Sequence, residues 1–315
     1  MNNITLFLLA AFIWGSTWLM ITFQLGSVEP LVSVIYRFTL ASLILFSYCL
    51  VTRKRLSYSK WEHLLILIQG LFLFGFNYWL TYLGITKVNS SMAAILSTSI
   101  VYFNVIFAKV FLSDKIKKEV VIGATIGVVG ISLVFSPDEL LTEPFWNSIL
   151  NSGGMDSTEA ISSETWTGIQ LVLVASIFAS LGNILSAKTQ RKKIPVIQAN
   201  ALGMAYAVIL LSFVAIFSGA EFTFEMSIKY VGSLFYLAIF GTVIAFGAFL
   251  TLVGRIGPDK AGYISLVYPV IALVFSTIFE DYQWSLTAGM GVIVILFGNF
   301  IAMGKHKTIG KLFHR

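Results

Sequence analysis

The sequence predicts an all-α integral membrane protein with ten transmembrane helices. Three observations lead to this fold class: long apolar segments, few charged residues, and positive charge that alternates between the connecting loops. The chain has 315 residues, of which 57% are hydrophobic and 11% are charged. Because soluble domains contain about 25% charged residues, this composition excludes an ordinary soluble globular protein.

Ten segments are apolar enough to cross a bilayer, whose hydrocarbon core of about 30 Å requires roughly 20 helical residues. Five of them precede residue 136 and five follow residue 167. The predicted spans are Ile4–Phe23, Leu31–Val51, Leu64–Leu83, Met92–Leu112, Val120–Phe135, Gly168–Ala187, Val196–Phe217, Val231–Val253, Ala261–Phe279 and Leu286–Met303.

The basic residues predict the orientation of these spans. With the N-terminus inside the cell, the inner loops and the C-terminal tail hold 17 of the 21 Lys and Arg residues, whereas the outer loops hold only Lys87 and Lys229. An excess of Lys and Arg marks cytoplasmic loops. We therefore expect a multi-pass protein of the cytoplasmic (cell) membrane with both termini in the cytoplasm. The net charge of +6 follows from this topology and requires no nucleic-acid partner.

A polar segment separates the two groups of five spans. Residues 136–167 contain six acidic residues and no Lys or Arg, and we expect them to form an outer linker. The chain is thus predicted to consist of a first repeat (1–135), the acidic linker (136–167), a second repeat (168–304) and a basic cytoplasmic tail (305–315).

The two groups of spans look like copies of one unit. Pairs 168 positions apart are Lys87 and Arg255, Ala93 and Ala261, and Ser97 and Ser265, while Pro30 and Pro195 are 165 apart. Since each copy has an odd number of spans, the second copy must insert with the opposite orientation. Inverted repeats of this kind build transporters with a binding site near the membrane midplane.

The sequence offers few of the residues that catalysis or metal binding requires. Every Asp and Glu lies outside the predicted spans or at their ends, and the three His residues lie at membrane margins or in the tail. Cys49 is the only cysteine, so an internal disulfide is impossible. We therefore expect no enzyme activity, no metal and no cofactor. Carriers driven by protons or sodium commonly use a carboxylate inside the membrane, and the predicted spans contain none at mid-depth.

Arg37 is a cation inside a predicted span, seven residues from its outer end. A planar guanidinium can bind a carboxylate through two parallel hydrogen bonds, so Arg37 is a candidate ligand for a substrate carboxylate. Snorkelling of the side chain to the outer headgroups, or hydrogen bonding to a neighbouring helix end, would explain the residue equally well.

Polar and aromatic side chains at similar depth complete a candidate substrate cavity. Trp14, Thr17 and Trp18 share one face of the first span, because residues three and four positions apart are neighbours on a helix. Helix packing is an alternative role for small hydroxyl residues such as Ser180, and an interfacial aromatic belt is one for Tyr82, whereas Trp14 is too central for a belt. The other candidates are Asn77, Tyr78, Tyr82, Ser97, Asn104, Ser180, Asn183, Tyr263, Ser265 and Tyr268. Pro269 is a candidate hinge, since proline removes a backbone donor and kinks a helix.

Several stretches of the chain form a recognisable pattern by their order and spacing. They are Ala11–Trp18 (AFIWGSTW), Pro30 with Tyr36–Phe38 and Ala41, Tyr82–Ala94 (YLGITKVNSSMAA), Phe111–Lys115 (FLSDK), Lys260–Pro269 (KAGYISLVYP) and Phe279-Glu280. This pattern resembles the EamA family of the drug/metabolite transporter superfamily. The resemblance implies ten helices in two inverted five-helix repeats, a central cavity lined by spans 1–4 and 6–9, and export of amino acids or other small metabolites. Val101 departs from the pattern, because the first repeat usually has a proline there.

We interpret the chain as an exporter of amino acids or related organic metabolites that works by alternating access. A carrier of sugar- or nucleotide-linked metabolites is an alternative. A polytopic membrane enzyme is another alternative, but it would need acids, histidines or a nucleophile near one interface, and the sequence lacks such a set. A non-transporting scaffold would not need the polar residues that the sequence places at mid-depth. The expected partners are a small-molecule substrate and the lipid bilayer, and the sequence gives no oligomeric state.

Overall fold

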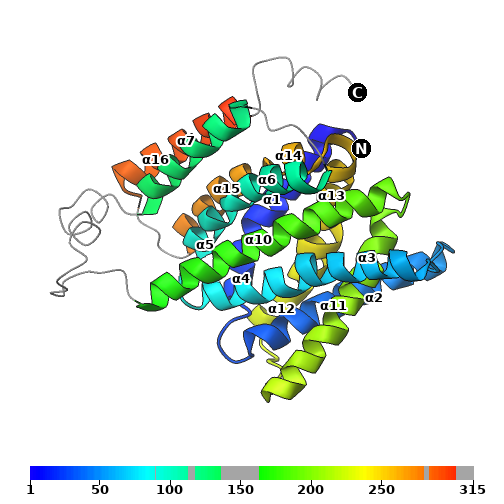
Figure 1. Ribbon diagram of the computed structural model, residues 1–315. Coiled ribbons are helices and arrows are strands. Elements are labelled where there is room, and N and C mark those ends of the chain that lie inside the picture. The colour runs from blue at the N-terminus through cyan, green and yellow to red at the C-terminus, as the bar shows by residue number, and fades with distance from the viewer. Residues whose placement is uncertain (89, 113–117, 136–162, 280–283, 303–315) are drawn as a thin grey trace, which may run out of the picture.

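The structure is a computed structural model that describes residues 1–88, 90–112, 118–135, 163–279 and 284–302. Within these ranges every regular element is a helix (Figure 1). Eight helical segments there are long and apolar enough to cross a membrane, by length and composition. The predicted class of an all-helical, multi-pass membrane protein is therefore confirmed.

The first half of the chain begins with two uninterrupted spans, and its third and fourth spans each change helix type midway. The elements are α1 (Asn3–Thr22), α2 (Pro30–Val51), α3 (Lys60–Gly70), the π-helix η1 (Leu71–Phe76), α4 (Asn77–Ile85), α5 (Ser90–Leu96), the 3-10 turn η2 (Ser97–Ser99), α6 (Ile100–Leu112) and α7 (Lys118–Phe135).

The second half also contains a π-helical segment within one span. Its elements are α10 (Ser163–Arg191), α11 (Val196–Ser218), α12 (Ile228–Tyr236), the π-helix η3 (Leu237–Ile244), α13 (Ala245–Ile256), α14 (Pro258–Ala261), α15 (Ile264–Phe279) and α16 (Leu286–Ala302). The helix α10 begins inside the predicted linker, whose residues 136–162 lie outside the described part of the chain, as does the predicted tail 305–315.

The fifth and tenth predicted spans coincide with α7, of 18 residues, and α16, of 17 residues. These two helices pack against each other beside the main bundle (Figure 1). Glycines allow their close approach: a Cβ atom at Gly130 would lie 2.7 Å from the backbone nitrogen of Ile295, and one at Gly298 would lie 2.6 Å from the carbonyl oxygen of Gly123. Neither helix is among the eight spanning segments.

Local sequence explains several helix ends. Ser59 and Glu62 form a reciprocal capping box at the start of α3, which satisfies two backbone donors. Pro30 occupies the first turn of α2, where its missing N–H is not needed. Gly219 ends α11 with a φ of 75°, a left-handed conformation that glycine adopts without strain.

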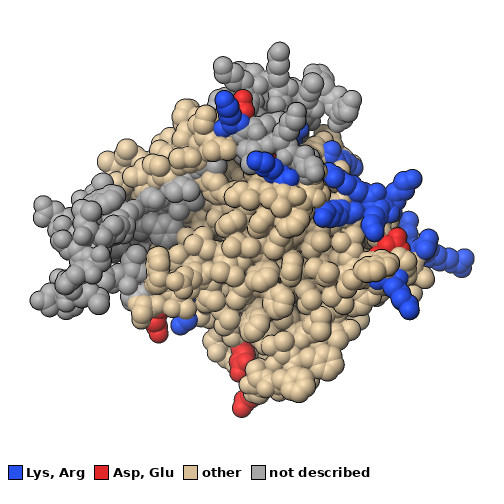
Figure 2. Space-filling view, in the orientation of Figure 1, with Lys and Arg blue, Asp and Glu red and all other residues tan. Residues whose placement is uncertain are grey.

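The main bundle places α1 against α13 and α15 on one side, and α10 against α4 and α6 on the other. Most Lys and Arg side chains visible in Figure 2 gather at one end of the molecule, where α2 ends and α3 begins in Figure 1. This is the end that the charge distribution predicts to be cytoplasmic.

Candidate functional site

A cavity of about 90 Å³ lies at the centre of the bundle. Side chains from α1, η1, α4, η2, α6, α10, α13 and α15 line it, so both halves of the chain contribute. Nine of the fourteen predicted site residues are among them: Trp14, Thr17, Trp18, Asn77, Tyr78, Ser97, Asn183, Ser265 and Tyr268.

Aromatic side chains from α1, α13 and α15 form one wall of the cavity. The ring of Trp14 has its centroid 5.0 Å from that of Phe246 and 4.9 Å from that of Phe249. The ring of Tyr268 lies 5.9 Å from that of Trp18. These separations fall within the range of about 4.5–7 Å that favours aromatic pairs, so the wall is a continuous set of packed rings.

Small and polar side chains from α4, η2 and α10 also line the cavity, namely Asn77, Thr81, Ser97, Ser176 and Asn183. Tyr78 of α4 adds an aromatic ring, whose centroid lies 6.0 Å from that of Phe246. The side-chain nitrogen of Asn77 donates to the carbonyl oxygen of Leu73 at 3.1 Å. Ser97 shares a 2.6 Å hydrogen bond with the hydroxyl of Tyr268 and so joins η2 to α15. None of the residues that line the cavity is acidic or basic.

Asn183 lines the cavity from α10, which packs against α6. Its Nδ2 atom donates to Oδ1 of Asn104 at 3.3 Å, and Nδ2 of Asn104 lies 3.5 Å from the carbonyl oxygen of Pro258. The Oδ1 atom of Asn183 has no hydrogen-bond partner within the described residues. This residue of the cavity lining therefore carries an unpaired buried acceptor.

Arg37 lies directly behind the cavity and is completely buried, with 0% of its surface exposed. Its Nε atom donates to the hydroxyl of Thr242 at 2.9 Å, and Nη1 donates to the hydroxyl of Tyr82 at 3.4 Å. Its guanidinium carbon lies 4.5 Å from the ring centroid of Tyr78, a cavity residue. The side chain therefore does not snorkel in this structure, and it stabilises contacts between α2, α4 and η3.

One nitrogen of Arg37, Nη2, has no hydrogen-bond partner within the described part of the chain. It lies against Gly241, where an added Cβ atom would come within 3.2 Å of it. The carbonyl oxygen of Gly241 in turn accepts a 3.1 Å hydrogen bond from Nε1 of Trp14. Gly241 therefore lies between the unpaired Nη2 group of Arg37 and the ring of Trp14 in the aromatic wall.

The remaining predicted residues do not reach the cavity surface. Tyr82 is buried beside Arg37, and Asn104 supports Asn183 from behind. Ser180 is buried on α10, and Tyr263 packs in a separate apolar cluster with Val101 and Leu266. Pro269 lies within the continuous helix α15, next to Tyr268, and its role as a hinge stays a prediction.

Eight lining residues are not among the predicted site residues, namely Ile21, Leu73, Thr81, Ile100, Ser176, Ala179, Phe246 and Phe249. The spacing of the internal repeat identifies three of them from predicted site residues. Phe246 lies 168 positions after Tyr78, Ile100 lies 168 positions before Tyr268, and Ala179 lies 165 positions after Trp14.

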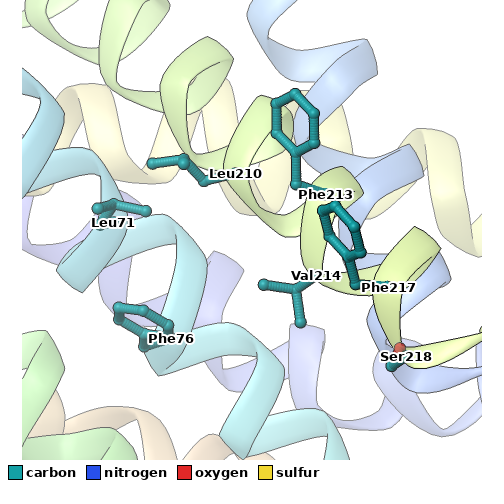
Figure 3. Close-up of a pocket in the computed structure, with 7 residues that line it drawn as sticks. All are labelled: Leu71, Phe76, Leu210, Phe213, Val214, Phe217 and Ser218. Atoms are coloured by element: carbon teal, nitrogen blue, oxygen red, sulfur yellow. The ribbon is translucent and has the colours of Figure 1, made fainter.

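A larger groove of about 580 Å³ lies on the outer surface between η1 and α11 (Figure 3). Its lining is almost entirely apolar, with Leu71 and Phe76 facing Leu210, Phe213 and Val214. Surfaces of this composition on a membrane-spanning helix face lipid tails. Because binding sites combine apolar walls with a few convergent polar groups, the central cavity is the better candidate for a substrate site.

Comparison with known proteins assigns the chain to a family. The model of the EamA-like transporter family matches residues 1–136 and 166–304. The chain belongs to this family. A solved crystal structure shares the fold over 99% of both chains, with a TM-score of 0.70 at 14% sequence identity.

Several bacterial relatives of this EamA-like transporter match it over most of their length. The uncharacterised inner membrane transporter YedA of Escherichia coli K12 is 27% identical over 296 residues, which cover 93% of this chain and 88% of YedA. The uncharacterised transporter YoaV of Bacillus subtilis is 28% identical over 295 residues, covering 92% of each chain. PagO of Salmonella typhimurium is 23% identical over 302 residues, covering 95% of this chain and 91% of PagO.

Proposed function

We propose that this EamA-like transporter exports amino acids or related organic metabolites that combine a carboxylate with an apolar or aromatic body. The observation that carries this proposal is the mixed lining of the central cavity, which combines aromatic rings with amide and hydroxyl side chains. A molecule with one apolar face and one polar face satisfies both kinds of side chain at once, whereas a purely apolar or a purely polar molecule leaves one kind unsatisfied.

The charge around the cavity favours an anionic group on the substrate. Arg37 is the cation nearest the cavity, and its Nη2 atom lacks a partner within the described residues. A carboxylate that passes Tyr78 and reaches this atom gains a charge-assisted hydrogen bond in a medium of low dielectric constant. A bare organic cation would meet the guanidinium without a compensating carboxylate, since the lining residues include no Asp or Glu.

The size of the cavity supports a mechanism with moving helices. Its volume of about 90 Å³ is well below the roughly 300 Å³ at which small-molecule pockets begin. A metabolite therefore enters only when the lining helices separate. Alternating access between two repeats would provide this separation on each side of the membrane in turn.

The lining residues also support a site between two repeats. Twelve of them form six pairs whose members lie 165 or 168 positions apart, the offsets of the internal repeat. The pairs are Trp14 and Ala179, Trp18 and Asn183, Tyr78 and Phe246, Thr81 and Phe249, Ser97 and Ser265, and Ile100 and Tyr268. Our proposal includes ten spans in two inverted five-helix repeats, with both termini in the cytoplasm.

Sugar- or nucleotide-linked metabolites are less well matched by this cavity. Their phosphate groups call for several cations, and the lining supplies none apart from Arg37 behind it. The relatives named as transporters favour transport over a membrane enzyme or a scaffold.

Flux from liposomes that contain the purified protein tests this proposal. We expect efflux of amino acids with large apolar side chains and little efflux of the corresponding amines, which lack the carboxylate, or of nucleotide sugars. Trp18→Ala removes one ring from the aromatic wall and should weaken the apparent affinity up to about tenfold, because an aromatic contact contributes about 0.5–1.5 kcal/mol.

Phe217→Ala is the matched control for this experiment, since Phe217 is 86% exposed on the outer face of α11 and should not affect flux. Efflux of nucleotide sugars without efflux of amino acids would contradict the proposed substrate. Equal losses in both variants would show that the central cavity is not the transport site.

A further inference from the structure

Seven basic residues from two connections form a surface at one end of the bundle, which we call the basic surface. The α2–α3 connection supplies four of them and the α10–α11 connection supplies three. They are Arg53, Lys54, Arg55, Lys60, Arg191, Lys192 and Lys193, and all are exposed. Figure 2 shows that Lys and Arg side chains dominate this end of the molecule.

The two connections are held together by contacts between their flanking residues. Tyr58 packs on an apolar cluster that contains Ile194 and Ala199. The hydroxyl of Tyr206 shares a 2.7 Å hydrogen bond with Nδ1 of His63. The carboxylate of Glu62 lies within electrostatic reach of both Arg55 and Lys192. The two connections therefore present their charges as one surface.

Two of these basic residues have an unusual backbone conformation. Arg53 has a φ of 51° and Lys193 a φ of 61°, and they are the only non-glycine residues with positive φ in the described part of the chain. Each follows the end of a helix that is closed by a backbone hydrogen bond spanning six residues. At the end of α2 the nitrogen of Lys54 donates to the carbonyl oxygen of Cys49 at 2.8 Å, and at the end of α10 the nitrogen of Ile194 donates to that of Thr189 at 3.3 Å.

Glycine is the residue that usually occupies this left-handed position at a helix end. The chain uses glycine there at the opposite end of the bundle, where Gly219 follows α11 with a φ of 75°. At the basic surface the chain has Arg53 and Lys193 at the two equivalent positions, although a residue with a side chain adopts this left-handed conformation less favourably than glycine. The cytoplasmic orientation of this end and the helix dipoles of α2 and α10 favour basic residues here, and the neighbouring Lys and Arg residues already meet both needs. These two roles therefore do not explain why Arg53 and Lys193 occupy the left-handed positions.

Exposed apolar side chains border the basic surface. Trp61 is 75% exposed, Leu50 is 69% exposed and Val51 is 84% exposed. Tryptophan and aliphatic side chains next to Lys and Arg suit the boundary between lipid headgroups and acyl chains. The border therefore favours a ligand that has both a negative headgroup and hydrocarbon chains.

We propose that the basic surface binds the headgroup of an anionic phospholipid, with Arg53 and Lys193 as the two principal contacts. Their side chains approach the phosphate from the two connections, while the acyl chains lie along Leu50, Val51 and Trp61. This site is separate from the central cavity and does not depend on which substrate is transported.

The thermal stability of the full-length protein in detergent, at about 150 mM salt to screen diffuse attraction, tests the proposal. Added phosphatidylglycerol should raise the Tm, and phosphatidylcholine should not. The double variant Arg53→Gly/Lys193→Gly should bind phosphatidylglycerol roughly tenfold or more weakly. Its Tm without lipid should equal or exceed that of the wild type, because glycine removes the backbone strain.

Two control variants separate specific binding from total charge. Lys87→Gln/Lys229→Gln removes two charges outside the basic surface and should keep the phosphatidylglycerol effect, and Arg53→Lys/Lys193→Arg should keep it as well. An unchanged lipid effect in the glycine variant would overturn the proposal. A lower Tm of that variant without lipid would also overturn it, because the two residues would then have a structural role. An equal effect of soluble glycerol phosphate would overturn it as well, because the site would then bind free phosphate.

Discussion

Arg37 is a buried charge without a buried counter-ion in the described spans. Removing an ionised group from water is expensive unless hydrogen bonds and dipoles replace the lost solvation. The hydroxyls of Thr242 and Tyr82 and the faces of Tyr78 and Phe38 provide part of this replacement. The Nη2 atom stays unpaired among the described residues, and in our proposal it is the group that binds the carboxylate of the substrate.

Replacement of Arg37 tests whether this group serves transport. Arg37→Gln should reduce flux at least tenfold while the protein still reaches the membrane. Its Tm should fall only slightly, because removal of a buried charge offsets the lost contacts with Thr242, Tyr82 and Tyr78. Arg37→Lys should be intermediate, since it keeps the charge but loses the planar group that stacks on Tyr78. Flux assays in liposomes, together with thermal melts, measure both effects.

Arg255→Gln is the matched control for this series. Arg255 is an exposed arginine whose guanidinium contacts the carbonyl oxygen of Met1 and the side chain of Asn3, far along α13 from the cavity. Its replacement should not alter flux. Normal transport by Arg37→Gln would show that Arg37 only joins helices.

The position of polar and aromatic residues along each predicted span was enough to find much of the candidate site. The direction in which each helix points its side chains, which the sequence does not give, accounts for the rest. Trp14, Thr17 and Trp18 were found because they share one face of α1. Arg37 contacts the ring of Tyr78 and is not itself a lining residue, because position along a helix alone does not define the direction of a side chain. Phe246 was missed because the sequence contains 27 phenylalanines, most of which suit a lipid-facing position equally well.

Two π-helical segments flank the cavity at matching places in the two halves. A shift of 168 residues places Leu71–Phe76 on Ile239–Ile244, the last part of η3. The segment η1 contributes Leu73 to the cavity, and η3 contributes the partners of Trp14 and Arg37. The hydroxyl of Thr242 bonds the carbonyl oxygen of Leu237, five residues earlier, at 2.8 Å. Short π-helices often occur at functional sites, and hydropathy does not reveal them.

A glycine-to-alanine pair tests the importance of η3. A Cβ atom at Gly241 would lie 2.8 Å from Cγ2 of Thr17 and 3.2 Å from Nη2 of Arg37, so Gly241→Ala should displace these side chains and reduce flux roughly tenfold. At Gly247, in the adjoining helix α13, an added Cβ atom meets nothing within 4 Å. Gly247→Ala should therefore keep full flux and gain up to about 1 kcal/mol of helix stability. Similar flux in both variants would argue against a role for η3.

At the scale of the whole molecule, hydropathy predicted the long helices well. The eight spanning segments coincide with eight predicted spans, because roughly 20 consecutive apolar residues have few other stable arrangements. The boundaries were less accurate: α10 extends from Ser163 to Arg191, beyond the predicted Gly168–Ala187. Its polar ends lower the local hydropathy, but backbone hydrogen bonds continue the helix through them.

The sidedness of the protein is the prediction on which the inverted-repeat proposal depends. Ser57, in the basic α2–α3 connection, and Met226, in the connection between α11 and α12, are both exposed at positions that we place on opposite sides of the membrane. Cys49 is buried, which keeps the background of cysteine labelling low. In intact cells, a membrane-impermeant maleimide should label Met226→Cys and spare Ser57→Cys.

After permeabilisation both cysteines should react, which controls for their accessibility. The physical reason for the expected pattern is the retention of Lys and Arg on the cytoplasmic side during insertion. Labelling of Ser57→Cys alone in intact cells would reverse the topology. Labelling of both would place the two connections on one side, and a five-span second half could then not be an inverted copy of the first. The paired lining positions, such as Tyr78 and Phe246, would then need another explanation than a site between two opposed repeats.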